Sequence, residues 1–284
     1  MLALWLRLIG DSIFNARLLS VFWGTATLFL LFIFTQKITK KNWISLIVTA
    51  LLALDPWSIM GAKIIRFYPA LQFFSLLSFW FFFKGFIERE GRWYQHLFFI
   101  TITWTILTQE VTVTLLPCFF VGFLFFYRPF HFFSDLSIVI SSVITISVFI
   151  YDILFFGIKC LTPWVALSYT TDSIIKPHLL DIAKFTNTFF FGMNRAYTIY
   201  SLFFFIGLIY FIKCKNSKIV FLFSSILINL AFLTLLVRQV ASRYFYPLHP
   251  LFTMLSVYSI ICLITSLGER FEESLKSLLP FRKI

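Results

Sequence analysis

Residues 69–86 read PALQFFSLLSFWFFFKGF, an apolar run with one charged side chain, Lys84, close to its end. A helix rises about 1.5 Å per residue, so a run of this length can cross the roughly 30 Å hydrocarbon core of a bilayer. In water, the consecutive rings of Phe81, Phe82 and Phe83 would form an exposed apolar patch that favours aggregation. The stretch therefore predicts a membrane-spanning helix.

The composition of the whole chain agrees with this stretch. Of its 284 residues 60% are apolar and 13% charged, and the mean hydropathy is +0.91. Soluble domains have roughly 45–50% apolar and about 25% charged residues, so an ordinary soluble protein is excluded. No segment is polar enough over tens of residues to form an aqueous domain. We expect a single membrane domain over residues 1–284.

Apolar runs on both sides of residues 69–86 predict further spans. A tight hairpin at Gln109 and Glu110 separates two short runs that together are too long for one span. The prediction is an all-α transmembrane bundle of about nine spans: residues 18–36, 43–60, 69–86, 94–108, 111–127, 136–156, 196–213, 219–237 and 247–267.

Both ends of the chain show amphipathic patterns. Leu2, Trp5, Leu6, Ile9 and Ile13 recur at helical spacing, which predicts an outer interfacial helix over residues 1–17. Apolar and charged residues also take separate faces over residues 268–284, predicted to be a cytoplasmic amphipathic tail. The alternative for both segments is a helical cap that only seals the end of the bundle. The bundle itself would occupy residues 18–267.

The basic residues lie in short gaps between the apolar runs, and the net charge is +12. Nine spans place 14 Lys and Arg on one side and 10 on the other, so the richer side is predicted to be cytoplasmic. The basic residues are typical of topology signals and lipid contacts, and no basic patch indicates nucleic acid. We expect an integral protein of a bacterial inner membrane or an equivalent membrane.

Other chemistries lack their sequence signals. The four His residues never lie two to five positions apart, so no zinc site is predicted, and the widely spaced Cys residues form no disulfide framework. There is no P-loop, GxGxxG, GxSxG or HExxH motif. Nucleotide-driven and serine-hydrolase chemistry therefore have no support.

Four segments, taken in chain order, resemble the motifs of one family. Residues 9–24 (IGDSIFNARLLSVFWG) are similar to its stretch G-(D/E)-S-x-F-x-x-R-L-P-S-x-x-F-G. Residues 53–56 (ALDP) and 65–68 (IRFY) are similar to its element A-L-x-P … x-x-R-x-Y. Residues 108–117 (TQEVTVTLLP) resemble T-K-x-x … L-L-P, and residues 242–250 (SRYFYPLHP) resemble R-Y-L-L-P-L-x-P. The family is that of multi-pass glycosyltransferases with the GT-C fold, which includes protein O-mannosyltransferase-like and lipopolysaccharide sugar-transferase-like enzymes.

The resemblance implies a GT-C-like bundle that transfers a sugar from a polyprenyl-phosphate-linked donor to a lipid, glycan or protein acceptor on the non-cytoplasmic face. Its partners would be membrane lipids and that donor. Two departures matter: Gln109 replaces the usual Lys, and the family's catalytic Asp lies in a loop upstream of the segment that residues 9–24 resemble. We therefore expect a missing N-terminal segment or a partner chain, and whether this chain is an active enzyme is left open. The alternative is a non-catalytic membrane protein that retained the fold, such as a transporter, a flippase-like bundle or an envelope-polymer assembly partner.

Cations and aromatic rings at the predicted outer ends of spans suit a lipid-linked sugar. Arg66, Arg238 and Arg243 are candidates for the donor phosphate, because a guanidinium forms paired hydrogen bonds with phosphate; alternatively each is an arginine that extends to the headgroups. Sugar or lipid contacts are assigned to Tyr68, Tyr244 and Tyr246, which are otherwise anchors of the aromatic belt.

Three acidic residues lie near predicted outer ends of spans, where a charge is costly without a role. Asp55 precedes Pro56 and is either an acidic site residue or a helix N-cap. Glu110 is a weak catalytic candidate, as an acceptor-side carboxylate or a ligand of a divalent cation; otherwise it is a plain loop residue. Asp152 is either a site residue or the partner of an outer arginine. Apart from a candidate divalent cation, no cofactor is assigned, and Glu110 is the sole catalytic candidate.

The charge count makes a topological prediction. Single cysteines that replace Lys40 and Lys215 should react with a membrane-impermeant reagent only from the cytoplasmic side, and one that replaces Lys176 only from the other side. The measurement is cysteine labelling in intact and in permeabilised cells. Labelling of Lys176→Cys from the cytoplasmic side alone would contradict the orientation.

Overall fold

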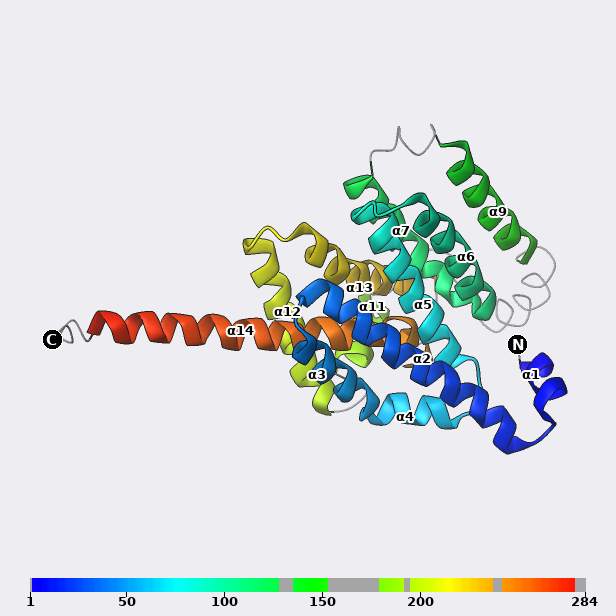
Figure 1. Ribbon diagram of the computed structural model, residues 1–284, viewed down its shortest axis with the longest axis horizontal. Helices are drawn as coiled ribbons and strands as arrows, with labels where there is room; N and C mark the ends of the chain where they lie inside the picture. Colours follow the sequence, from blue (N-terminus) through cyan, green and yellow to red (C-terminus); the bar gives the residue numbers. More distant parts are fainter. Residues whose placement is uncertain (1, 128–134, 153–178, 192–194, 237–241, 279–284) are drawn as a thin grey trace.

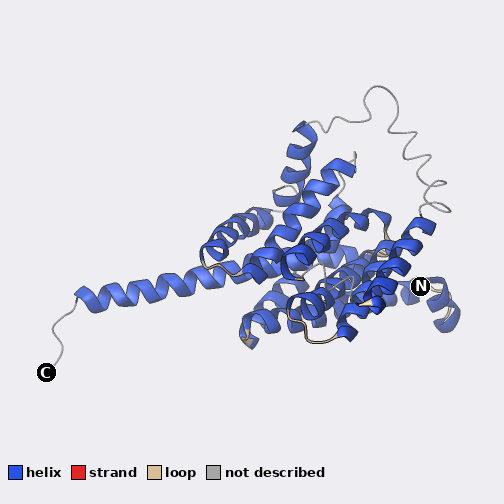
Figure 2. Ribbon diagram, turned by 90° about the horizontal axis from the view of Figure 1, so that it is seen from above, coloured by secondary structure: helices blue, strands red, loops and turns tan. Residues whose placement is uncertain are grey.

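The computed structural model describes residues 2–127, 135–152, 179–191, 195–236 and 242–278. Over these residues every regular element is a helix, and no strand is present (Figures 1 and 2). Backbone N–H and C=O groups find no water in hydrocarbon, and a helix pairs them within one segment. The all-α prediction is confirmed.

Over the described residues, each of the nine predicted runs coincides with one or two helical segments, while α11 lies between the sixth and seventh runs, where no span is predicted. In chain order the described elements are α1 (Leu2–Ile9), α2 (Ile13–Thr39), α3 (Asn42–Ala53), α4 (Pro56–Lys63), α5 (Tyr68–Phe82), η1 (Phe83–Ile87), α6 (Arg92–Thr108), η2 (Glu110–Leu115), α7 (Leu116–Phe126), α9 (Leu136–Asp152), α11 (Leu179–Phe190), α12 (Arg195–Lys213), α13 (Ser217–Leu236), η4 (Ser242–Leu248) and α14 (His249–Leu278).

Judged by the length and composition of the helices, fewer segments qualify as membrane spans than the sequence predicts. Among the described residues, four helical segments are long and apolar enough to cross a membrane, and α3 with α4 makes a fifth if this pair, bent by 57°, is one broken span. Three further apolar helices are shorter: residues 111–126, 136–148 and 198–213. The count of about nine is therefore not confirmed, because short segments make up the rest.

The predicted interfacial helix over residues 1–17 is instead two helices. Gly10 has a φ of 107° and ends α1, and the Ser12 hydroxyl caps α2 by accepting a hydrogen bond from Asn15 N at 3.1 Å. The Asn15 amide donates back to the carbonyl oxygens of Ile9 and Gly10, at 3.1 and 2.9 Å. These capping bonds make Ile13, rather than Leu18, the first residue of the long helix.

At the other end of the chain, α14 continues without a break past the predicted boundary at residue 268. Figure 1 shows it as a single long helix that projects beyond the rest of the bundle. A Cβ at Gly268 would meet nothing within 4 Å, which agrees with this projection. The apolar pattern ends near residue 267, but the helical backbone does not.

In the middle of the bundle, the ring of Phe82 in α5 contacts three other helices. Its centroid lies 5.3 Å from that of Phe98 in α6, 5.1 Å from Phe119 in α7 and 5.5 Å from Phe221 in α13. Gly122 in α7 permits this approach, because a Cβ there would overlap the Phe221 ring. Between helices in lipid, such close packing replaces the hydrophobic effect as the main attraction.

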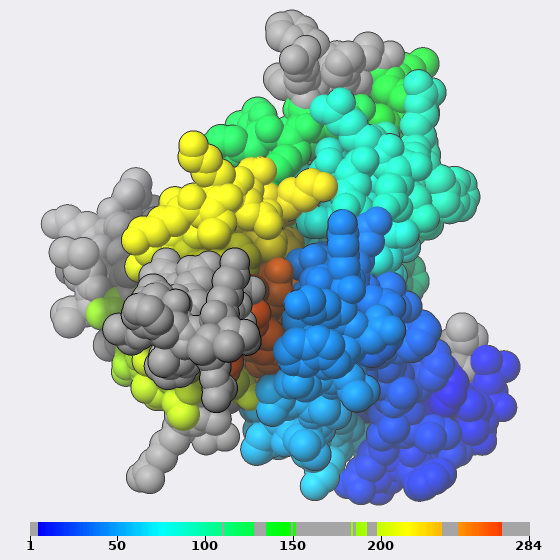
Figure 3. All heavy atoms as spheres, turned by 60° about the vertical axis from the view of Figure 1, so that its left-hand side comes forward, coloured from blue at the N-terminus to red at the C-terminus, as the bar shows by residue number. Residues whose placement is uncertain are grey.

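A cluster of charges joins three segments at one end of the bundle. Lys37 Nζ in α2 lies 3.0 Å from a carboxylate oxygen of Glu88 and 2.5 Å from one of Glu90. Lys84 in η1 lies 3.2 Å from Glu90, and Lys218 in α13 lies 3.6 Å from Glu88. In Figure 3 the blue segment around the α2–α3 turn and the yellow segment around the α12–α13 turn flank α14. Three of the predicted cytoplasmic gaps thus share one end.

Glu90 should stabilise the bundle in a pH-dependent way. The hydrogen bond from Lys37, with a second from Lys84, lowers the pKa of Glu90 from 4.5 to about 2. Its contribution should therefore be complete above pH 4.5 and should be lost as the pH falls toward 2. The difference in Tm between wild type and Glu90→Gln, measured in detergent, should be larger at pH 7 than at pH 3.

The exposed Asp11, at the start of the chain, provides the control for this experiment. Asp11→Asn should leave Tm unchanged at both pH values. A Glu90→Gln difference that is equal at pH 7 and pH 3 would show that the ion pairs with Lys37 and Lys84 do not stabilise the fold.

Candidate functional site

Asp55 lies at the bend between α3 and α4. Its backbone is extended, with φ −67° and ψ 123°, and its carboxylate accepts a hydrogen bond from Ser58 N at 2.8 Å. Pro56 occupies the first turn of α4, where its missing N–H leaves no bond unmade. The interpretation of Asp55 as a helix N-cap is confirmed.

The same carboxylate lies beside His249, the first residue of α14. Asp55 Oδ2 is 3.6 Å from His249 Nε2, and the two side chains are only 10% and 3% exposed. On the other edge of the ring, His249 Nδ1 is 3.4 Å from both Ser58 Oγ and the Gln72 amide nitrogen. His249 thus joins the start of α4, the first turns of α5 and the start of α14.

Sequence reasoning did not select His249, Ser58 or Gln72 as site residues. His249 belongs to segment 242–250, but its spacing from the other histidines bears only on a zinc site. One sequence signal could have identified His249: it is a histidine within a motif, and this motif lies at the same predicted membrane depth as Asp55.

Beside Asp55 and His249, two of the tyrosines predicted to contact sugar or lipid stack on each other. The rings of Tyr68 and Tyr246 lie 5.1 Å apart with an interplanar angle of 19°, and the Tyr246 hydroxyl donates to the Trp57 carbonyl at 2.8 Å. Arg66 is exposed and donates to the Tyr68 hydroxyl at 3.2 Å. Tyr244 is also buried. The three tyrosines therefore do not have the exposure of belt anchors, and Arg66 lies against the stacked pair.

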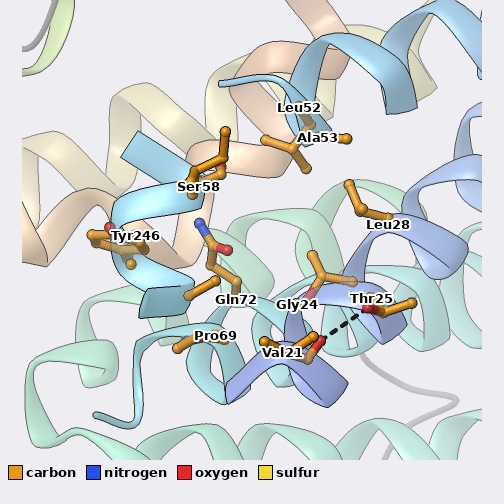
Figure 4. A pocket seen from close by; sticks show the side chains of 14 residues that line it. Val21, Gly24, Thr25, Leu28, Leu52, Ala53, Ser58, Pro69, Gln72 and Tyr246 are labelled. Atoms are coloured by element: carbon orange, nitrogen blue, oxygen red, sulfur yellow. Dashed lines mark hydrogen bonds between the residues drawn. The ribbon is translucent and has the colours of Figure 1, made fainter. Parts of the chain in front are cut away.

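A cavity of about 150 Å³ opens next to these residues. Figure 4 shows the Gln72 side chain extending from α5 with its amide directed toward Ser58 of α4, while Tyr246 stands at one side. Apolar residues of α2 and α3 form the opposite wall. The lining residues are Val21, Gly24, Thr25, Thr27, Leu28, Leu52, Ala53, Ser58, Ile59, Gly61, Ala62, Pro69, Gln72 and Tyr246.

All four motif segments of the sequence meet at this end of the bundle. The first lines the cavity through Gly24, and its Ser20 hydroxyl donates to the Ile64 carbonyl at 3.4 Å. The second provides Asp55, Arg66 and Tyr68. The third enters η2, which packs against η4, and η4 with His249 carries the fourth.

The structure does not describe the side chains of the remaining predicted site residues. Arg238 lies outside the described residues. The backbones of Arg243, Glu110 and Asp152 belong to η4, η2 and the end of α9, but their side chains are not described. Within the described ranges, no three His, Cys, Asp or Glu side chains gather in a group that could hold a metal ion.

Comparison with known proteins gives one match. The family model for dolichyl-phosphate-mannose-protein mannosyltransferase matches residues 7–171, a stretch that contains the first three motif segments. No curated protein and no solved structure matches the chain.

Two glycines that line the cavity provide a test of the packing. A Cβ at Gly61 would overlap the Tyr246 phenol, whereas one at Gly24 would meet only Ala62 Cβ at 3.9 Å. Gly61→Ala should therefore destabilise the protein by about 1–3 kcal/mol, the usual cost of overpacking, and Gly24→Ala should not. Thermal unfolding of both variants in detergent measures the difference. Equal Tm values would show that α4 is not held against Tyr246.

Proposed function

The chain belongs to the dolichyl-phosphate-mannose-protein mannosyltransferase family, and from this premise we propose where its donor binds and on which face it acts. Membership makes it a membrane glycosyltransferase that uses a polyprenyl-phosphate-linked sugar. The non-catalytic alternative is not favoured. We propose that the sugar passes to a lipid, glycan or protein acceptor on the non-cytoplasmic face, at the end where the four motif segments meet.

The convergence of these segments is the observation that carries the proposal. They are spread over most of the chain, yet the first, second and fourth provide residues to one cavity or one aromatic pair, and the third packs beside them through η2 against η4. Packing of the fold alone would not require chemically distinctive residues to collect at a single end. A shared ligand at this end accounts for it.

Arg66 has the geometry expected of a ligand for the donor phosphate. One Nη donates to Tyr68, while the side chain as a whole is exposed, so other N–H groups of the fork can face a headgroup. A guanidinium binds phosphate through paired hydrogen bonds. We propose Arg243 and Arg238 as further phosphate ligands, since the sequence places them in or just before η4.

The two ends of the bundle support the proposed orientation. The cluster of Lys37, Lys84, Glu88, Glu90 and Lys218 lies at the end that the charge count assigns to the cytoplasm. The helices that leave this end reach Arg66 and Asp55 at the other. A lipid phosphate in the outer leaflet would lie at the level of Arg66. We propose Glu110, which opens η2 beside η4, as the acceptor-side carboxylate.

Replacement of Arg66 should weaken binding of the donor headgroup. A hydrogen bond to a charged group contributes about 1.5–3 kcal/mol, so Arg66→Gln should bind polyprenyl monophosphate roughly ten- to a hundredfold more weakly than wild type. Arg66→Lys should lose less, because it keeps the charge without the fork. Binding is measured on purified protein in detergent, and sugar transfer from polyprenyl-phosphate-linked hexoses is measured in parallel.

Lys215→Gln serves as the control, because Lys215 is an exposed cation at the opposite end of the bundle. Its affinity for the monophosphate should equal that of wild type. Equal affinities of wild type, Arg66→Gln and Lys215→Gln, with all three folded, would remove the phosphate assignment of Arg66.

A further inference from the structure

The buried ring of His249 contacts polar groups on both of its edges. Nε2 faces Asp55 at 3.6 Å, and Nδ1 faces Ser58 and Gln72 at 3.4 Å each. The edge of the ring also packs against Trp57, with centroids 5.3 Å apart. Polar groups cost free energy when they are buried, and an apolar side chain would fill the same space without that cost. The pair therefore needs a role other than filling space.

A short series of contacts leads from this pair to Arg66. His249 begins α14 directly after η4, and Asp55 is the N-cap of α4, so their contact holds η4 against α4. Two residues after Asp55, Trp57 offers its carbonyl to the Tyr246 hydroxyl, and the rings of Trp57 and Tyr246 lie 4.3 Å apart.

The series ends at the surface. The ring of Tyr246 is held by Trp57 on one side and stacks on Tyr68 on the other. Tyr68 in turn accepts a hydrogen bond from Arg66. The links are the close approach of Asp55 to His249, the short chain segment from Asp55 to Trp57, and then hydrogen bonds and ring contacts. A shift of His249 relative to Asp55 would thus move the tyrosine pair and the guanidinium that lies on it.

We propose that His249 and Asp55 are positioning residues, whose buried contact sets the place of Tyr246 and Tyr68 and so aims Arg66 at the phosphate of the lipid-linked donor. This inference rests on the proposed function, because it assumes that Arg66 binds the donor. Neither residue touches the substrate. Their effect should therefore appear in the affinity for the headgroup, through Arg66, and should depend on both partners together.

The test uses variants that keep as much of the local structure as the chain allows. Asp55→Asn retains an oxygen that can cap α4 but removes the charge that faces His249. His249→Leu removes the polar contacts and keeps an apolar side chain, and His249→Gln restores an amide that can donate to Asp55. The double variant Asp55→Asn/His249→Leu completes the cycle. Binding of polyprenyl monophosphate and KM and kcat for sugar transfer are measured on each purified protein in detergent.

We expect Asp55→Asn and His249→Leu each to weaken binding of the monophosphate about tenfold and to raise KM with little change in kcat. The double variant should bind no more weakly than the poorer single variant, and His249→Gln should recover part of the loss. If His249→Leu does not fold, the binding of the monophosphate by folded Asp55→Asn and His249→Gln still tests the positioning role. Affinities equal to that of wild type would refute it.

The matched control is His96→Gln. His96 also bridges two helices, since its Nδ1 lies 2.9 Å from Ser141 Oγ, but it lies near the start of α6, away from Arg66. This variant should bind the monophosphate as wild type does.

Three outcomes would overturn the inference. Folded Asp55 and His249 variants that bind like wild type, while Arg66→Gln binds weakly, would refute the positioning role and leave the proposed function intact. Additive losses in the double variant would show that the two residues act separately. No binding by wild type would overturn both proposals.

Discussion

The carboxylate of Asp55 satisfies two demands at once, and the site end of the bundle depends on it. Where α3 ends, the backbone turns by 57° into α4, and the first N–H groups of the new helix lack helical partners. Asp55 supplies an acceptor to Ser58 N and lies beside His249, so it stabilises the bend and joins it to the last motif of the chain. With this bend, both the end of α3 and α4 contribute to the wall of the cavity, through Leu52 and Ala53 and through Ser58.

The two ends of the bundle use polar side chains in different ways. At one end, lysines and glutamates pair near the surface, where Lys37 and Glu90 remain about one-third exposed. At the other end, Asp55, His249 and Gln72 are nearly buried and lie among aromatic rings. Between them, the contacts of Phe82 with α6, α7 and α13 are apolar. This distribution follows from the cost of charge at membrane depth, which restricts polar clusters to the ends of the helices.

Much of this arrangement is predictable from the sequence, and prediction of the remaining features fails for identifiable physical reasons. The apolar runs locate the helices because run length and helix rise are local properties. They do not decide which helices cross the membrane: α6 has 17 residues and the pair α3–α4 is bent. The stretch 1–17, predicted as one helix, is divided in two, because Gly10 and the cap at Ser12 outweigh a hydrophobic pattern that continues to Ile13.

The sequence by itself determined that the chain is a helical membrane protein and that its motifs are similar to those of a glycosyltransferase family, and it offered an N-cap as one of two roles for Asp55. Each of these depends on neighbours in the chain or on the order of short motifs. Only the tertiary structure decided that His249 faces Asp55, that Tyr246 stacks on Tyr68, and that the tyrosine pair holds Arg66. These contacts join residues far apart in the sequence. They exist because the bend at Asp55 and the start of α14 meet at one depth, and local patterns carry no information on that meeting.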